Sequence, residues 1–342
     1  MRTVQEIITD YDLPIVQIDG KRNYWLVRTQ SGEYHEEFYF DDFIAIGWDD
    51  FNNKEEFENP SNEGYLKKQI ASKYPESKQP GLIYNQIRRF FTEMKLGDLV
   101  MIPSKNSTHI SFGKVVSEPY IADIPSTDIE EGICPFQKRL DVDWIKTAKR
   151  AELDPYLYKM MNSHHTINNA NEYASFIDRT LHSFYMKNGN AHLVMRIKKQ
   201  GVLNGLDFFE FGQMIIDLLP EVKNLGFTKE EINKRKDIKV KSNVQSPGIV
   251  EFISSTPAII LGVGVLLTFL VGGKAEFKYT KKEKNASVQS KGLVELFIKY
   301  KKQKSEDELE KMREKHRQTM DRVKAEIPKE LNKLPDRKNQ EE

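Results

Sequence analysis

The segment Phe43–Phe51, FIAIGWDDF, places a tryptophan and two acidic residues directly after a run of apolar residues. Aromatic and β-branched residues are enriched in strands, so residues 43–48 predict a strand. Because side chains of a strand alternate between its two faces, Trp48 would share a face with Ile44 and Ile46. If both faces are buried near the end of this strand, Trp48 closes a pocket there.

The chain on either side of this segment predicts a strand-rich module with a helical insertion. Residues 24–29 are aromatic and β-branched and are followed by a QSGEY turn. The alternation typical of strands returns, between glycine, proline and asparagine, in stretches at 99–103, 108–120 and 140–145. Each of these stretches predicts a strand. Between them the apolar spacing changes to three and four residues, which predicts helices at 64–74 and 80–94 with a proline-rich turn between them.

Length and charge limit the classes of function. The 342 residues suffice for two or three domains, each with its own core. The net charge is +1, but residues 229–342 hold 26 Lys and Arg against 18 Asp and Glu, so residues 1–228 carry −7. Nonspecific duplex binding depends on Lys and Arg that neutralise phosphates. The acidic front part therefore favours a small nucleotide or a single flipped base over long duplex DNA.

The composition changes along the chain and predicts four regions. These are a first domain at 1–155, a mainly helical middle region at 156–228, a strand-helix region at 229–304 and a charged helical tail at 305–342. The single cysteine, Cys134, permits no internal disulfide, which fits a reducing compartment. The first residues lack the apolar core of a secretory signal, so we expect no cleaved leader.

Residues 252–273 are 22 consecutive uncharged residues between Glu251 and Lys274. A bilayer core about 30 Å thick needs about 20 such residues in a helix, so the length fits one crossing. One crossing, a helix that dips into one leaflet and a helix buried in the protein are all open interpretations. Lysines on both sides would meet anionic headgroups. We therefore expect a transmembrane or membrane-associated segment at the cytoplasmic side of an inner membrane, with the cytoplasm as the alternative location.

A short internal match flanks this apolar segment. VQSPGIVEF at 244–252 resembles VQSKGLVEL at 288–296, an offset of 44 residues. Each copy follows a lysine-rich run and precedes a predicted helix. The two copies therefore predict a duplicated strand-helix unit around the hydrophobic segment, with chance similarity as the alternative. Copies that pair in one sheet would lie on one side of a membrane, which conflicts with a single crossing between them.

The tail predicts a charged helix with one narrow, largely apolar stripe. The stripe consists of Leu309, Met312, His316, Met320, Val323 and Ile327. Such a stripe pairs with a partner helix or lies on its own domain. For a run this charged, packing on its own domain is the commoner arrangement.

The sequence lacks a recognisable catalytic motif. It contains no GxxxxGK[ST], nucleophile elbow or HExxH, and no convincing metal-dependent nuclease signature. His164 and His165 are adjacent, so on a helix they point about 100° apart and cannot ligate one metal together. We interpret them as a surface pair. The sequence therefore predicts a protein that is not an enzyme, with no metal site and no cofactor.

Aromatic residues on the predicted strands indicate a binding surface instead. Tyr24, Trp25, Phe43 and Trp48 lie on the first two strands, with Arg28 close in sequence and Trp144 on a later strand. Aromatic faces stack on nucleobases for about 1–3 kcal/mol each, and an arginine adds a cation-π or phosphate contact. The alternative is that Trp25 and Trp144 are core residues, as large aromatics mostly are.

Three stretches, in this order, resemble a known family. They are YWLVRTQSGEYHEEFYFDDFIAIGWDDF, GLIYNQIRRFFTEMKLGDLVMIPSKNSTHISFGKVVSEPY and QKRLDVDWIKTAKRAEL. Over about residues 22–155 they look like the N-terminal PUA/EVE-like domain of Mrr-type restriction proteins. The resemblance implies an α+β fold with a small β pseudo-barrel whose pocket holds a modified or flipped base, or a nucleotide. The restriction nuclease domain that usually follows in that family is absent from this sequence.

The resemblance also assigns residues to that pocket. Gly47 and Trp48 match the family's IGW element, Gly113 and Lys114 its GKV element, and Arg139 and Trp144 its R.V.W strand. Together with Tyr24, Trp25, Arg28 and Phe43 from the aromatic strands, they make ten predicted ligand-binding residues.

These features together predict a non-enzymatic prokaryotic antiphage-defence protein. Its first domain would sense a base or nucleotide, and its C-terminal part would act at the membrane, through a homo-oligomer. The alternative is a soluble specificity subunit that binds modified DNA and recruits a separate nuclease. A third interpretation is a membrane-tethered scaffold whose front domain binds protein.

Overall fold

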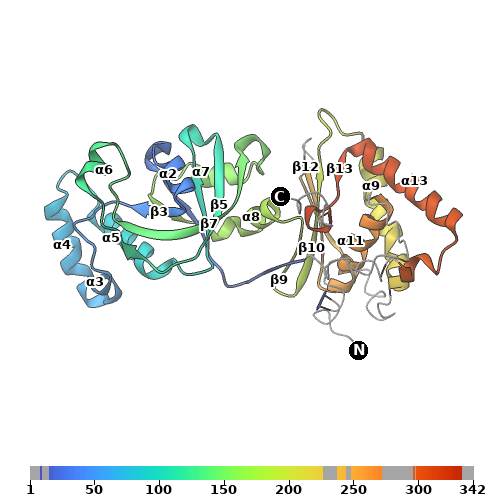
Figure 1. The fold of residues 1–342 in the computed structure, drawn as a ribbon, viewed down its shortest axis with the longest axis horizontal. Helices are drawn as coiled ribbons and strands as arrows, with labels where there is room; N and C mark the ends of the chain where they lie inside the picture. The colour runs from blue at the N-terminus through green and yellow to red at the C-terminus, as the bar shows by residue number, and fades with distance from the viewer. Residues whose placement is uncertain are drawn as a thin grey trace, which may run out of the picture. The chain divides into compact units, whose positions relative to one another are not determined.

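The chain folds as an α+β protein in two compact units (Figure 1). The computed structural model describes residues 8–9, 15–225, 237–243, 248–271, 296 and 298–332. Residues 21–181 form the N-terminal unit, and residues 1–20 with 182–342 form the C-terminal unit. The division at 181 falls inside the predicted middle region, so that region contributes to both units.

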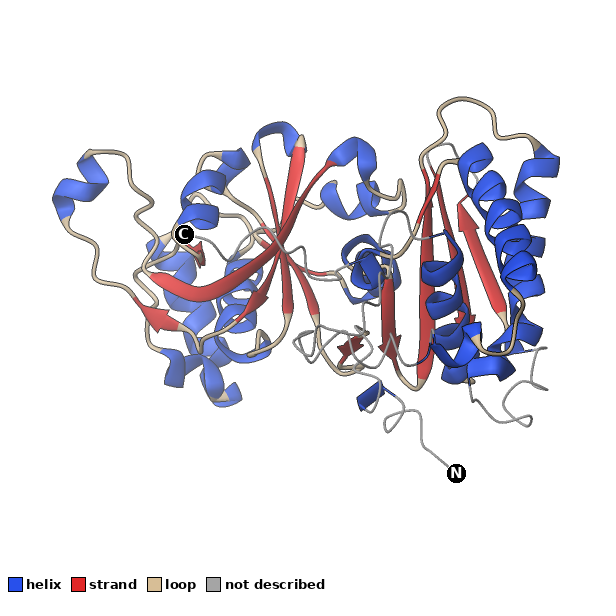
Figure 2. Cartoon of the chain, turned by 45° about the vertical axis from the view of Figure 1, so that its right-hand side comes forward, coloured by secondary structure: helices blue, strands red, loops and turns tan. Residues whose placement is uncertain are grey.

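The N-terminal unit contains a seven-stranded sheet in the order β3-β7-β5-β4-β2-β8, with β6 beside β7. The strands are β2 Tyr24–Val27, β3 Phe43–Ile46, β4 Leu99–Pro103, β5 His109–Val115, β6 Tyr120–Ile121, β7 Lys138–Lys149 and β8 Ile167–Asn169. The pair β2 and β4 is parallel and the other pairs are antiparallel. The first residues of β7 pair with β3 and the later ones with β5, and the sheet curls into a half-barrel (Figure 2).

Short helices connect and cover these strands. They are α2 His35–Phe40, α3 Lys54–Glu58, α4 Glu63–Lys73, α5 Pro80–Arg88, α6 Ser126–Glu130, α7 Leu157–Met161 and α8 Ala174–Leu181. Shorter helical turns are η1 Gln30–Gly32, η2 Pro60–Asn62, η3 Arg89–Glu93, η4 Lys105–Ser107, η5 Arg150–Glu152 and η6 Asn171–Tyr173. The predicted strands of the front module and both helices of its insertion are therefore confirmed.

Strands β2, β3 and β4 of the N-terminal sheet are buried at every position. On β2, Trp25 and Val27 belong to a core that also contains residues of α3, α4 and α5. Tyr24 and Leu26 belong to a second core, with residues of α7 and α8. This alternation follows from the two-residue period of a strand. A strand that is apolar at every position is therefore explained by burial on two sides.

In its described residues, the C-terminal unit has a six-stranded sheet in the order β1-β9-β10-β12-β11, with β13 beside β10. Its strands are β1 Val16–Ile18, β9 Phe184–Lys187, β10 Asn190–Ile197, β11 Lys239–Asn243, β12 Gly248–Ser254 and β13 Ala325–Glu326. Its helices are α9 Gly205–Leu218, η7 Leu219–Leu225, α11 Pro257–Val271, α13 Glu306–Val323 and α14 Lys329–Asn332. Within this unit α11 packs against β10, β12, α9, α13 and η7.

Residues 252–271, the described part of the apolar segment, contribute to the core of the C-terminal unit, so the predicted membrane segment and inner-membrane location are wrong. The segment begins inside β12, and all residues 258–270 of α11 are buried. A Cβ on Gly262 would lie 2.5 Å from a methyl carbon of Val222, so glycine permits close packing there. In the described ranges, no helix combines the length and the apolar character that a membrane crossing requires.

The tail helix α13 packs on its own unit. Of the two predicted arrangements, pairing with a partner helix or packing on its own domain, this is the one expected to be commoner. Ser305 and Glu308 form a capping box at its start. Leu309, Met320 and Val323 of the predicted stripe join the core around α11. The charged helix is therefore held by burial of one face.

Two other sequence predictions have different outcomes. The predicted mainly helical region 156–228 also contains β8, β9 and β10, because pairing with β2 and within the C-terminal sheet determines the conformation of those short apolar runs. The first copy of the predicted repeat includes β12 and precedes α11. Residues 244–247 and 288–295 of the two copies lie outside the described residues.

Candidate functional site

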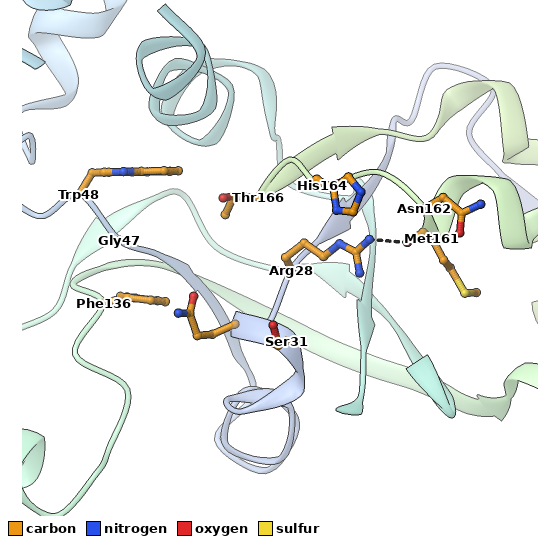
Figure 3. A pocket seen from close by; sticks show the side chains of 10 residues that line it. Arg28, Ser31, Gly47, Trp48, Phe136, Met161, Asn162, His164 and Thr166 are labelled. Atoms are coloured by element: carbon orange, nitrogen blue, oxygen red, sulfur yellow. Dashed lines mark hydrogen bonds between the residues drawn. The ribbon is translucent and has the colours of Figure 1, made fainter. Parts of the chain in front are cut away.

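A cavity of about 800 Å³ lies in the N-terminal unit, where β2 and β3 end (Figure 3). We call it the Trp48 pocket. Its lining residues follow β2, follow β3, precede β7, or lie at the end of α7 and in the connection from α7 to β8. They are Arg28, Gln30, Ser31, Gly47, Trp48, Phe136, Met161, Asn162, His164 and Thr166. Strand β3 is buried on both faces. The sequence analysis predicted that Trp48 closes a pocket if this condition holds.

Two aromatic rings form opposite walls of the Trp48 pocket. Figure 3 shows the rings of Trp48 and Phe136 edge-on, one on each side of the space beside Gly47. A Cβ on Gly47 would lie 3.1 Å from the Phe136 ring, so glycine allows that ring to pack close to the backbone. Two rings that face a common space suit a flat ligand better than a round one.

The backbone around the Trp48 pocket is strained. Trp48 has a φ of +63°, a left-handed conformation that is unfavourable for a bulky residue. Gln30 and Ser31, with φ values of +49° and +58°, also line this pocket. Such strain persists only where surrounding contacts hold it, and it concentrates at functional sites. The strain identifies this pocket as the candidate site of the N-terminal unit.

A fully buried lysine holds the Trp48 loop in this conformation. The Nζ of Lys138 donates hydrogen bonds to the Trp48 carbonyl at 2.9 Å, to Asp49 Oδ1 at 3.1 Å and to Asn52 Oδ1 at 2.8 Å. All three donors of the ammonium group are therefore used. Burial lowers the pKa of Lys138, against the opposing effect of Asp49. Lys138 is thus a clamp on the wall of the pocket.

The same loop is joined to the wall that carries Phe136. The backbone N–H of Gln137 donates to Asp49 Oδ1 at 3.1 Å, and Asn52 Nδ2 donates to Gln137 Oε1 at 2.7 Å. Because Phe136 and Lys138 flank Gln137, these bonds fix the two aromatic walls relative to each other. The two walls are therefore held together by hydrogen bonds within the protein itself.

Arg28 brings positive charge to the Trp48 pocket. Its Nε donates to the Ser163 carbonyl at 3.1 Å, and its Nη2 donates to the carbonyls of Met161 and Ser163. Burial lowers the pKa of Arg28. A guanidinium nevertheless stays protonated in proteins, so Arg28 keeps its charge. Within the described part of the chain, no carboxylate forms an ion pair with Arg28 and its Nη1 makes no hydrogen bond. The pocket therefore suits a ligand with a negative group.

Three of the ten predicted site residues, Arg28, Gly47 and Trp48, line the Trp48 pocket. Tyr24 and Trp25 are buried in the two cores instead. The Trp25 indole donates to Asp98 Oδ2 at 2.8 Å. These two side chains stabilise the sheet and lie outside the cavity lining.

The five remaining predicted residues also lie outside the lining. Arg139 packs its guanidinium 4.0 Å from the centre of the Phe43 ring and donates to the Phe136 carbonyl at 3.1 Å, so this pair supports the Phe136 wall from behind. Gly113 lets Trp144 pack closely, since a Cβ would lie 2.7 Å from that ring. Lys114 is exposed on β5.

Sequence reasoning missed Phe136 and the loop between α7 and β8. Phe136 follows Cys134 and Pro135 just before a strand, which gives only a weak signal because its partner Trp48 is far away in sequence. His164 and His165 are both exposed, as expected of a surface pair, and His164 also lines the pocket. In the ranges that the structure describes, no three His, Cys, Asp or Glu side chains are placed to hold a metal ion.

Comparison with known protein families found a match to the N-terminal unit. Residues 23–171 match a domain of unknown function, DUF8426. The match lies within residues 21–181, the N-terminal unit, and covers less than half of the chain. A comparison with curated proteins found no match. The pocket therefore lies in the part of the chain that recurs as a domain.

Proposed function

We propose that the N-terminal unit binds a nucleobase in the Trp48 pocket, either of a nucleotide or of a modified or flipped base in nucleic acid. The observation that carries this proposal is the pair of facing aromatic walls, Trp48 and Phe136, beside the guanidinium of Arg28. Stacking on an aromatic ring contributes about 1–3 kcal/mol per base and accepts any base. Two rings therefore supply the larger part of the binding energy.

The charge around the pocket supports an anionic partner for the base. Residues 21–181 hold 20 Lys and Arg against 25 Asp and Glu, so this unit as a whole repels nucleic acid. None of the residues lining the pocket is acidic, and Arg28 and His164 are among them. A phosphate attached to the bound base would meet Arg28. Recognition by this unit is therefore local, at one nucleotide, and does not need a broad basic surface.

The curled sheet supports the resemblance to PUA/EVE-like domains, which we propose as the fold family of this unit. A role in prokaryotic antiphage defence follows from that resemblance and is part of the same proposal. Recognition of modified DNA by a specificity subunit would use the same pocket. The binding experiment below therefore comes before any test of the biological role.

The proposal is tested by calorimetric titration of the full chain with nucleoside monophosphates and short single-stranded oligonucleotides. We expect saturable binding, and an affinity that falls about tenfold or more in Trp48→Ala and in Phe136→Ala because one stacking face is removed. Tyr65→Ala removes an aromatic side chain that is 61% exposed on α4 and serves as the control. An unchanged melting temperature would show that the variants fold.

Two results would contradict the proposal. One is that neither class of probe binds the wild-type chain. The other is that Trp48→Ala and Phe136→Ala bind as tightly as the Tyr65→Ala control.

A further inference from the structure

Helix α9 of the C-terminal unit is apolar on two opposite faces. One face lies in the core of the unit, and its buried residues are Phe211, Met214, Ile215 and Leu218. The other face is open to solvent: Leu206 is 71% exposed, Phe209 is 72% exposed and Ile216 is 54% exposed. A surface helix normally turns polar residues away from the core, so this second apolar face is suited to contact with another apolar surface. We call it the Phe209 face.

The Phe209 face carries no charge. Its residues are spaced so that they share one side of the helix, and they are Gly205, Leu206, Phe209, Gly212, Gln213 and Ile216. The three acids of α9 form ion pairs with basic residues of the same unit, two of them on the adjacent α13 (Figure 1): Asp207 with Lys199, Glu210 with Arg322 and Asp217 with Lys315. Two such faces therefore meet without repulsion between like charges.

Gly212, in the middle of α9, is not required by packing within one chain. A Cβ on Gly212 would meet nothing within 4 Å, and the same holds for Gly205. Glycine is one of the least favourable residues in a helix interior, so Gly212 weakens α9 without serving a close contact there. A bulky side chain that packs from outside against the backbone of α9 would explain the glycine.

Large and small residues of the Phe209 face match one another in an antiparallel pair of helices. The pair Phe209 and Gly212 and the pair Gly205 and Ile216 have the same midpoint along α9. If two copies of α9 run antiparallel about a two-fold axis at that midpoint, each Phe209 faces Gly212 of the other copy, and each Ile216 faces Gly205. Large side chains opposite small ones interdigitate and fill the space between two helices. The face is therefore complementary to itself.

A lipid surface matches the Phe209 face less well. Helices that lie in the membrane interface carry Lys and Arg beside their apolar side. The charged residues of α9 itself are all acidic, and anionic headgroups repel acids. These charges favour a protein surface as the occupant.

We infer that the Phe209 face binds the same face of a second copy of this chain, which makes the protein a two-fold dimer. Such a contact is isologous, and dimers of this symmetry are the commonest homo-oligomers. The inference gives the homo-oligomer expected from the sequence a defined contact surface. It does not depend on the proposed function, because α9 and the Trp48 pocket belong to different units.

The first test is sedimentation equilibrium of the full chain over a range of protein concentrations. We expect a species of twice the chain mass that dissociates on dilution. Phe209→Lys should weaken the dimer about tenfold or more, because it removes the large apolar side chain and adds a cation to each copy. Phe40→Lys replaces a phenylalanine that is 74% exposed on α2, and this control should dimerise like the wild type.

The second test separates dimerisation from folding. Gly212→Leu should weaken the dimer about tenfold or more, whereas the melting temperature of the monomer should stay the same or rise, because leucine favours a helix. Gly64→Leu on α4, where a Cβ also meets nothing within 4 Å, is the matched control. Unfolding of every α9 variant is measured at a dilution where the wild type is monomeric, so that loss of the dimer does not count as loss of stability.

The third test addresses the pairing of residues across the two-fold axis. Gly212→Phe alone places two phenylalanines opposite each other and should weaken the dimer. The double variant Phe209→Gly with Gly212→Phe restores a large residue opposite a small one, so it should dimerise about tenfold more tightly than Gly212→Phe.

Three results would overturn the inference. One is a wild-type chain that stays monomeric up to about 100 μM, which excludes a specific dimer of useful affinity. Another is a dimer that Phe209→Lys and Gly212→Leu leave unchanged, because the contact then uses a different face. The third is a monomeric chain that sediments with vesicles of phosphatidylglycerol and phosphatidylethanolamine and fails to do so as Leu206→Asp, which would assign the face to lipid.

Discussion

Each unit contains an apolar stretch, but the stretch at β3 leads into the wall of a pocket whereas the stretch at α11 forms part of a core. In the N-terminal unit, the run that ends β3 continues into a strained, half-buried Trp48 held by the buried ammonium of Lys138. In the C-terminal unit, the longer run that includes α11 is buried in a core of apolar side chains. The difference teaches that strain and buried polar contacts identify a site, whereas apolar length alone identifies only burial.

The largest effect should come from a charge placed in the core of the C-terminal unit. Leu266 of α11 is fully buried, and Leu266→Asp would put a carboxylate among apolar side chains. We expect a loss of about 4 kcal/mol or more in the free energy of unfolding, measured by urea denaturation. Leu206→Asp on α9, where the side chain is 71% exposed, should cost less than about 0.5 kcal/mol.

This pair of variants can break the comparison between the units. If Leu266→Asp is as stable as Leu206→Asp, then α11 is not the core of the C-terminal unit. The apolar segment would then need another explanation.

A smaller effect, on both stability and binding, is expected at the clamp. Lys138→Met keeps the length of the side chain but leaves the Trp48 carbonyl and Asn52 Oδ1 without their donor. We expect a loss of about 2 kcal/mol in the free energy of unfolding. Backbone strain of about 1–3 kcal/mol at Trp48 is then no longer held, so nucleotide affinity should fall about tenfold by calorimetry.

The exposed Lys114 provides the matched control for the clamp. Lys114→Met removes a lysine that the family resemblance assigned to the site but that lies outside the cavity lining. It should change neither stability nor affinity. A Lys138→Met variant that binds nucleotide like Lys114→Met would show that the clamp does not hold the pocket.

Only some of the contacts behind these predictions could be predicted from the sequence. The strands and helices around FIAIGWDDF could be predicted because apolar period and turn residues are local signals. The partners of Trp48 could not, because Phe136 and Lys138 reach it through a strand pairing distant in sequence. The membrane prediction failed for the same reason, since the residues of α9, α13 and η7 that cover α11 are visible only in the fold.

The smallest effect is a pH dependence of the C-terminal unit. His316 of α13 is buried, and burial lowers its pKa, while Asp217 acts in the opposite direction. A folded pKa below the unfolded value of about 6.5 means that protons bind the unfolded chain more strongly. The stability due to neutral His316 is therefore complete above about pH 6.5 and falls as the pH is lowered from there.

The measurement for His316 is urea denaturation between pH 8 and pH 5 in the wild type and in His316→Leu. The wild type should lose more stability on acidification than the variant does. Parallel pH profiles would show that protonation of His316 is not coupled to folding of the C-terminal unit.

Stacking of a base at Trp48 is tested most directly by NMR of the three indole N–H groups during a nucleotide titration. The indoles of Trp25 and Trp144 donate to Asp98 and to the Phe38 carbonyl, away from the cavity lining. We predict that the Trp48 resonance, assigned with Trp48→Phe, shifts on titration while the other two stay in place. A titration that shifts Trp25 or Trp144 and leaves Trp48 unchanged would contradict the placement of the base in this pocket.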